Sequence, residues 1–143
     1  MSLSHKQEII SELKQEHKNI LSLFLLAYES DIKTAKGKSK FRDALFQLQL
    51  HDEKEEQHIY QPVRDLSLDQ KEPEDVQLFS EIKQFGIENT LTIIKEFADN
   101  LEDESESNMT HIDSNFLMVI DVFKERVKFE EETLFEMCSK LDK

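Results

Sequence analysis

Residues 4–31, SHKQEIISELKQEHKNILSLFLLAYESD, contain side chains that recur on one helical face at steps of three and four residues. Such steps keep side chains on one side of an α-helix, because the helix completes a turn about every 3.6 residues. The stripe comprises Ile10, Leu13, His17, Ile20, Phe24 and Tyr28. This stretch therefore predicts a long amphipathic helix that buries one face against the rest of the protein.

Three further segments show the same periodicity, at about 39–64, at about 73–101 and from about residue 110 onward. Each stripe is mainly apolar, and each is interrupted by polar residues near the middle of its segment. In chain order the three stripes are Phe41, Leu45, Leu48, His51, Glu55, Ile59 and Pro62; Ile82, Phe85, Glu88, Leu91, Ile94 and Ala98; and Phe116, Val119, Phe123, Arg126, Glu130, Leu134 and Met137.

The boundaries of these segments carry helix signals. Pro62 breaks a helix, Pro73 suits a first helical turn, and Thr110 is a candidate N-cap. The connecting links are short and polar, and they lie at 33–40, 67–72 and 102–108. Four long helices with short links predict an all-α fold, a single antiparallel up-and-down four-helix bundle. One domain is expected to occupy 1–143, with its core at about 10–140.

The chain is acidic, with 18 Lys and Arg against 31 Asp and Glu and a formal net charge of −13. Nucleic acids and anionic membranes attract cationic faces, so neither is an expected partner. The single cysteine, Cys138, excludes an intramolecular disulfide, and the first residues contain no apolar signal-peptide core. No apolar run approaches the ~18 residues of a membrane span. We therefore predict a cytoplasmic protein.

Six ionisable residues fall on the predicted inward faces, where apolar side chains are the rule. They are His17, His51, Glu55, Glu88, Arg126 and Glu130. Since each lies near the middle of its helix, a bundle would bring them to one level, and burial requires that they pair or hold an ion. His51 and Glu55 share a face four residues apart, the arrangement from which metal sites in helical bundles are built. Imidazole and carboxylate together suit iron or zinc.

The second and fourth segments echo each other at an offset of 75 residues. The sequence HDEKEEQHIY at 51–60 aligns with RVKFEEETLF at 126–135. The matched pairs are His51 with Arg126, Glu55 with Glu130, Glu56 with Glu131, Ile59 with Leu134, and Tyr60 with Phe135. The echo suggests a bundle assembled from two related helix pairs.

Three motifs together resemble the hemerythrin-like (HHE cation-binding) family: EHKNI at 16–20, HDEKEEQHIYQP at 51–62 and FEEETLF at 129–135. The resemblance spans roughly residues 10–140. It implies a four-helix up-and-down bundle around a non-haem di-iron centre. It also implies a role in binding dioxygen, or in sensing or handling oxygen, nitric oxide or iron.

Transferred by position, the resemblance makes His17 and His51 ligands of one iron, with Glu55 and Glu130 as bridging carboxylates. At two positions where the family places histidine, this chain has Glu88 and Arg126. A mononuclear iron site is therefore expected more than a di-iron site, with Glu88 as a further candidate ligand. Arg126, a permanent cation, is expected to replace the second metal. His58, seven residues after His51, is a candidate outer contact.

Two other interpretations stay open. In the first, the site binds no metal, and Arg126 with buried glutamates forms an ion-pair network in a helical scaffold or protein-interaction module. In the second, the protein is a ferritin-like carboxylate enzyme, which requires Glu-x-x-His on two helices. Only Glu55 and His58 form such a pair in the second and fourth segments, so enzymatic activity is not favoured. The expected partners are a metal ion and a small diatomic ligand.

Overall fold

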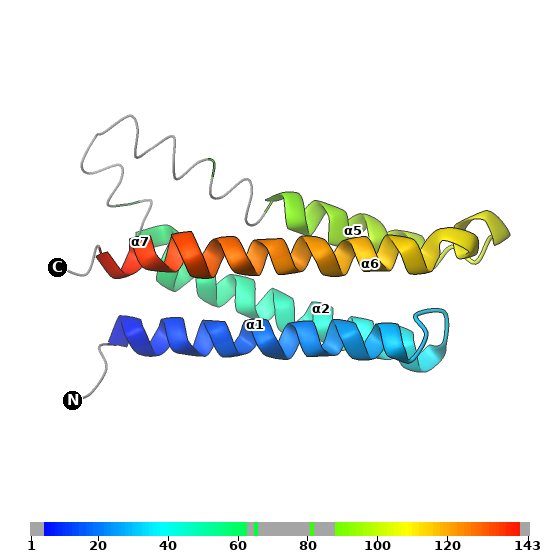
Figure 1. The fold of residues 1–143 in the computed structure, drawn as a ribbon, viewed down its shortest axis with the longest axis horizontal. Helices are drawn as coiled ribbons and strands as arrows, with labels where there is room; N and C mark the ends of the chain where they lie inside the picture. Colours follow the sequence, from blue (N-terminus) through cyan, green and yellow to red (C-terminus); the bar gives the residue numbers. More distant parts are fainter. Residues whose placement is uncertain (1–4, 63–64, 66–80, 82–87, 141–143) are drawn as a thin grey trace.

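The computed structural model describes residues 5–62, 65, 81 and 88–140; at 137, 139 and 140 only the backbone is described. Every regular element in this part of the chain is helical (Figure 1), which confirms the all-α prediction for it. The elements are α1 (His5–Glu29), α2 (Ala35–Glu55), η1 (Glu56–Tyr60), α5 (Thr90–Leu101), α6 (Glu106–Phe129), η3 (Glu130–Leu134) and α7 (Phe135–Lys140). No helix among them is long and apolar enough to cross a membrane. The predicted link at 67–72 and the predicted helix start at Pro73 lie outside the described residues.

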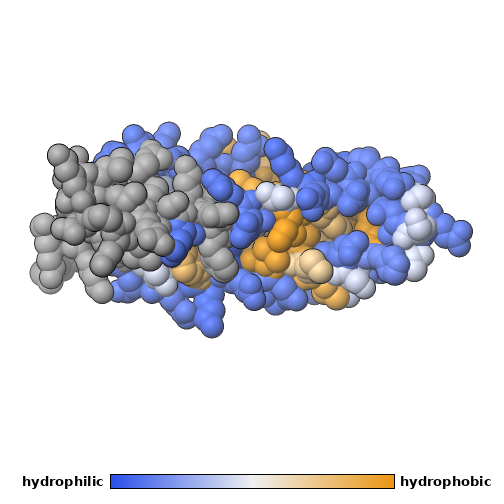
Figure 2. All heavy atoms as spheres, turned by 90° about the horizontal axis from the view of Figure 1, so that it is seen from above, coloured by the Kyte–Doolittle hydropathy of each residue, from blue (hydrophilic) through white to orange (hydrophobic). Residues whose placement is uncertain are grey.

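The described helices form four rods, because α2 continues into η1, and α6 continues through η3 into α7 (Figure 1). α1 packs against α2 and α6, and α5 packs against α6. The start of α1 and the end of α7 lie at the same end of the molecule (Figure 1). Viewed from above, hydrophilic side chains cover most of the described surface, and apolar side chains gather near the middle of this face (Figure 2).

A tight turn joins α1 to α2, and it makes α2 begin at Ala35 rather than near residue 39 as predicted. Thr34 caps α2, since its Oγ1 accepts a hydrogen bond from the amide of Gly37 at 3.0 Å. Asp31 adopts a left-handed conformation with φ of 69°. A Cβ atom at position 37 would lie 2.1 Å from the carbonyl oxygen of Asp31, so only glycine fits this approach.

The turn before α6 also differs from the sequence prediction. Ser105 caps α6, because its Oγ accepts a hydrogen bond from the amide of Asn108 at 3.4 Å. Thr110 lies inside the helix, where its Oγ1 donates to the carbonyl oxygen of Glu106 at 2.8 Å, so the prediction that Thr110 is the cap is wrong. Serine and threonine serve equally as caps, and the pattern alone does not choose between them.

Phenylalanine rings from the four rods meet in the larger part of the core. The rings of Phe41 and Phe97 lie 5.2 Å apart, and Phe116 lies 5.6 Å from Phe41 and 5.1 Å from Phe97. Phe24 of α1 contacts Phe123 of α6 at 5.4 Å. Truncating such a ring to alanine typically costs about 3–5 kcal/mol, so these contacts hold the rods together.

The buried apolar residues form two clusters, and a polar layer lies between them. The larger cluster is Ile20, Phe24, Ala27, Ile32, Phe41, Ala44, Leu48, Ile94, Phe97, Leu101, Ile112, Phe116, Val119, Ile120 and Phe123. The smaller is Ile9, Ile10, Leu13, Ile59, Tyr60, Leu134, Phe135 and Cys138. On each rod that contributes to both clusters, ionisable residues separate the two sets. The fold therefore surrounds these polar residues with apolar packing on both sides.

Candidate metal centre

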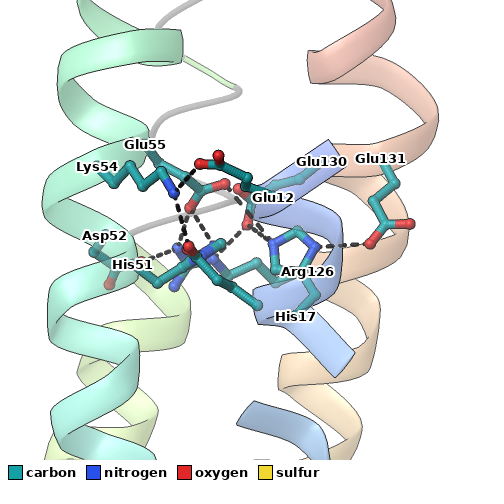
Figure 3. Close-up of polar contacts among 10 residues, drawn as sticks. Glu12, His17, His51, Asp52, Lys54, Glu55, Arg126, Glu130 and Glu131 are labelled. Carbon is teal, nitrogen blue, oxygen red and sulfur yellow. Dashed lines mark hydrogen bonds and ion pairs between the residues drawn. The ribbon is translucent and has the colours of Figure 1, made fainter. Parts of the chain in front are cut away.

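Four potential ligands converge from three rods within the polar layer (Figure 3). His17 comes from the middle of α1, His51 and Glu55 come from the end of α2, and Glu130 opens η3. One ligand atom from each residue lies within 4.8 Å of the other three. The histidines are 2% exposed and the glutamates 0% exposed. The structure thus brings together the four residues predicted as the principal ligands.

Outer carboxylates hold both imidazole rings in place. Nδ1 of His17 lies 2.7 Å from Oε2 of Glu131, and Nδ1 of His51 lies 2.8 Å from Oε1 of Glu16. Since a carboxylate only accepts, each Nδ1 carries the hydrogen, and Nε2 of the neutral ring presents its lone pair to the interior. A carboxylate behind a histidine is the usual support of a metal-ligating imidazole, because it fixes the tautomer and the ring orientation.

The inward atoms of all four residues have no hydrogen-bond partner among the described residues. They are Nε2 of His17, Nε2 of His51, Oε2 of Glu55 and Oε2 of Glu130. A buried polar atom without a hydrogen-bond partner costs about 1–3 kcal/mol of folding free energy. Four such atoms at one place therefore destabilise a metal-free core. The nearest contacts of the imidazoles do not form hydrogen bonds: Nε2 of His51 lies 3.1 Å from Oε1 of Glu55, and Nε2 of His17 lies 3.8 Å from Glu55 and 3.9 Å from Glu130.

Two imidazoles and two carboxylates fit a first-row transition metal. Such ions bind nitrogen and oxygen ligands at about 2.0–2.2 Å, which keeps ligand atoms within about 4.4 Å of one another. The observed limit of 4.8 Å is slightly looser, and small side-chain rotations would close it. The residues present therefore fit a metal ion, and one ion would satisfy all four inward atoms.

Arg126 lies beside this group, as its inward register predicted, and it is 1% exposed. Its Nε donates to Oε1 of Glu130 at 2.6 Å, and its Nη2 donates to Oε1 of Glu55 at 3.0 Å. Nη2 also donates to Asp52. Each glutamate therefore accepts from the guanidinium through Oε1, and its Oε2 has no hydrogen-bond partner among the described residues. Arg126 thus places a permanent positive charge between the two carboxylates.

Charge interactions set the protonation of the two glutamates. Burial and repulsion from Glu55 raise the pKa of Glu130 well above its ordinary value. Burial alone would also raise the pKa of Glu55, but its interactions with Glu130, His17 and His51 outweigh burial and lower that pKa well below its ordinary value. Of the two carboxyl groups, Glu130 therefore keeps its proton to the higher pH. A metal ion would replace that proton.

The histidine and arginine respond to the same carboxylates. Burial alone would lower the pKa of His51, but its interactions with the carboxylates of Glu55 and Glu16 outweigh burial and raise it. Burial likewise opposes the charge of Arg126, yet Glu130, Asp52 and Glu55 raise its pKa well above its ordinary value. The polar layer therefore carries an excess of negative charge that favours cations.

A π-helical turn begins directly after one of the two candidate ligand glutamates and at the other. η1 begins directly after Glu55, and η3 begins at Glu130. The extra residue of a π-turn brings two consecutive apolar residues into the core on each rod, and such turns occur often at functional sites. These residues are Ile59 and Tyr60, and Leu134 and Phe135. They are matched pairs in the 75-residue echo, so the local helix geometry follows the sequence repeat.

Glu88 does not join the site, and the prediction that it faces the interior is wrong. It is exposed, whereas Thr90, two residues later, is 2% exposed. The buried face of α5 is Thr90, Ile94, Phe97 and Leu101, so it is rotated from the predicted stripe, which used Ala98 in place of Phe97. Burying a phenylalanine removes more apolar surface from water than burying an alanine, and the helix turns accordingly.

His58 is also displaced from its predicted position on the face of His51. It is half-buried, and its ring lies 6.3 Å from that of His5 in an edge-on arrangement. The prediction assumed an uninterrupted α-helix, but η1 contains His58 and shifts the register after Glu55. Residues 59 and 60 take the buried positions instead.

Sequence reasoning missed the polar residues that support the site. Glu16, Asp52 and Glu131 each stand next to a predicted site residue in the sequence. Neighbours on a helix diverge by about 100°, so the periodicity assigns them to outer faces. Their long side chains nevertheless reach across to another helix. The signal that would have identified them is their position directly next to a predicted buried histidine or glutamate in the sequence.

Lys54 extends this support to the surface (Figure 3). Its Nζ lies 2.6 Å from Glu12 and 2.9 Å from Glu16, and Glu16 in turn holds His51. Burial alone would lower the pKa of Lys54, but these two carboxylates outweigh burial and raise it. The lysine therefore restrains the carboxylate that orients an inward-facing imidazole.

No protein-family model, curated protein sequence or solved structure matches this chain. The features of this chain that bear on function are therefore the geometry of the polar layer and the sequence motifs.

Proposed function

We propose that this protein is a hemerythrin-like, antiparallel four-helix bundle that binds one metal ion on His17, His51, Glu55 and Glu130. The observation that carries the proposal is the convergence of four buried ligand atoms that have no hydrogen-bond partner among the described residues. A set of this kind, with outer carboxylates behind both imidazoles, is costly in a metal-free core and favourable around an ion.

A single ion is proposed because Arg126 already uses one oxygen of each ligand glutamate. A second metal at that position would have to displace a guanidinium that also donates to Asp52. Removing one partner from a buried ion pair costs about 3–5 kcal/mol, which opposes such a displacement. The chain therefore retains one half of a two-cation arrangement and fills the other half with its own cation.

We propose non-haem iron as the ion, since mixed imidazole and carboxylate ligands suit it, and zinc is the nearest competitor. Iron at this position supplies one-electron redox chemistry and affinity for small diatomic molecules. Sensing or handling of oxygen, nitric oxide or iron in the cytoplasm is the corresponding role, without enzymatic turnover. The protein's own residues orient the ligands, neutralise the carboxylates and keep the layer away from bulk water.

The test is metal content per chain after anaerobic reconstitution with Fe²⁺, and in parallel with Zn²⁺. The expected result is about one ion per chain in the wild type. His51→Ala should lose more affinity than the ~10–100-fold that supporting residues contribute. His58→Ala is the matched control and should bind as the wild type does. Two irons per chain would contradict the single-ion arrangement, and no binding of either metal would overturn the proposal.

A second candidate function follows from the three carboxylates around Arg126. In this version the ion-pair network replaces the metal entirely, and the bundle serves as a scaffold for protein interactions. A wild-type chain that binds neither metal, and that unfolds readily once Arg126 is removed, would favour it. The metal titration above separates the two functions directly.

A further inference from the structure

A small cavity of about 140 Å³ lies between α5 and α6, and Arg126 is among the residues that line it. Its lining combines polar and aliphatic side chains from both helices. These are Asn89, Thr90, Ile93, Val122, Glu125 and Arg126. Thr90 is 2% exposed and Arg126 is 1% exposed, so the two polar residues with the least solvent contact form its inner end.

Arg126 brings an unsatisfied donor to this cavity. Its Nε and Nη2 are used by Glu130, Glu55 and Asp52. Nη1 is buried and has no hydrogen-bond partner among the described residues. An arginine offers five N–H groups and no acceptor, so a ligand in the cavity that satisfies Nη1 must accept hydrogen bonds. A buried cationic donor without a partner is costlier than a neutral one.

The size of the cavity restricts the ligand. A water molecule takes up about 30 Å³, so 140 Å³ accommodates a molecule of a few heavy atoms. A planar oxyanion suits a guanidinium, because charge-assisted hydrogen bonds are shorter and roughly twice as strong as neutral ones. The hydroxyl of Thr90 and the amide of Asn89 are additional donors in the lining.

We propose that this cavity is a binding site for a small oxyanion of the formate or nitrite class, held by Arg126 and Thr90. The surrounding charges make its affinity depend on the metal. Asp52, Glu55 and Glu130 place three carboxylates against one guanidinium, and Glu125 adds another at the exposed part of the lining. A divalent ion on the proposed ligand set would offset part of this negative charge. The dependence of anion affinity on metal rests on the proposed function, whereas the anion site in the cavity does not.

The experiment is an NMR titration of ¹³C-formate, and of nitrite followed by the protein's amide shifts, into metal-free and Zn²⁺-loaded protein. Thr90→Val removes the buried hydroxyl without changing the shape of the side chain. Thr92→Val is the matched control on the same helix, because Thr92 is exposed and its Oγ1 bonds to the carbonyl oxygen of Glu88. Thr90→Val should weaken anion binding about tenfold, the usual effect of one hydrogen bond to a charged group, and Thr92→Val should leave it unchanged.

Val122→Phe supplies a second test, since it fills the cavity from α6 without touching a ligand residue. It should abolish anion binding while the protein still takes up zinc. Anion binding that is unaffected by both Thr90→Val and Val122→Phe would mean direct ligation to zinc, which overturns the inference. Zinc uptake without any anion binding also overturns it and leaves the proposed function intact. Anion binding sensitive to both variants in a protein that takes up no metal supports the cavity and refutes the metal site.

Discussion

Arg126 and Glu130 lie one helical turn apart, and the Nε of the arginine donates to Oε1 of the glutamate at 2.6 Å, while Oε2 is buried and has no hydrogen-bond partner among the described residues. Glu55 of α2 has the same arrangement, because its Oε1 accepts from Nη2 of Arg126 and its Oε2 is likewise unpartnered in the described part of the chain. The guanidinium therefore satisfies one oxygen of each buried carboxylate. The other oxygen of each is the one that the proposed metal ion would bind.

Replacing Arg126 with leucine should destabilise the metal-free protein by about 3–5 kcal/mol, because it leaves buried carboxylates without their cation. Urea unfolding measures this loss. Excess Zn²⁺ should restore part of it, since a ligand bound at 100 times its Kd stabilises by about 2.7 kcal/mol. Arg42→Leu is the control: Arg42 is exposed and contacts the exposed Glu102 at 3.5 Å, so its loss should cost less than about 1 kcal/mol. Equal stability of the two variants would refute the role assigned to Arg126.

The raised pKa of Glu130 predicts a specific pH dependence of the metal-free protein. An unfolded glutamate releases its proton near pH 4.3, whereas the folded Glu130 keeps it to higher pH. The folded state thus binds the extra proton, and its stability falls as pH rises from about 4.3 toward the folded pKa, by up to about 1.4 kcal/mol per pH unit. Glu130→Gln cannot titrate and should lose this contribution to the slope.

Urea unfolding of wild type and Glu130→Gln from about pH 4.5 to about pH 7.5, with a chelator present, checks this prediction, because this range lies above the pKa of about 4.3 of an unfolded glutamate. The difference in unfolding free energy should move in favour of the variant as pH rises. A pH-independent loss of stability caused by the glutamine side chain next to Arg126 would change the unfolding free energy of the variant equally at every pH. It therefore does not affect the slope against pH. Parallel curves would show that Glu130 does not hold the proton.

Glu16→Gln should weaken metal binding about 10–100-fold, because the carboxylate behind His51 fixes the ring and raises its basicity. Glu131→Gln should act in the same way through His17. A competition titration against a chromogenic chelator measures both. Glu12→Gln is the control, since Glu12 contacts Lys54 and no histidine in the described structure, and its effect should be small. Metal affinity unchanged in Glu16→Gln and Glu131→Gln would exclude the supporting role of these carboxylates.

Much of the site could be predicted from residue spacing alone. His17, His51, Glu55, Arg126 and Glu130 are all buried, as their places on apolar stripes indicated. Apolar residues one turn away flank His17, the His51–Glu55 pair and the Arg126–Glu130 pair on both sides, so burying those residues carries the polar ones inward. Glu88 is flanked by Phe85 and Leu91 in the same way in the sequence, but α5 buries Thr90 and Phe97 instead, and Glu88 is exposed.

The sequence by itself determined the helical rods and five of the six polar residues predicted to face inward, all except Glu88, because both depend on local periodicity and on apolar burial. Only the tertiary structure decided the partners. Asp52 reaches Arg126, Glu16 reaches His51, and Glu131 reaches His17, each across a gap between helices. Such contacts depend on how the rods are rotated and spaced, and the π-turns after Glu55 and at Glu130 adjust that rotation by a single residue. Periodicity along one helix does not show which residues of a neighbouring helix it contacts. The side-chain partners in the polar layer are therefore set only when the rods pack together.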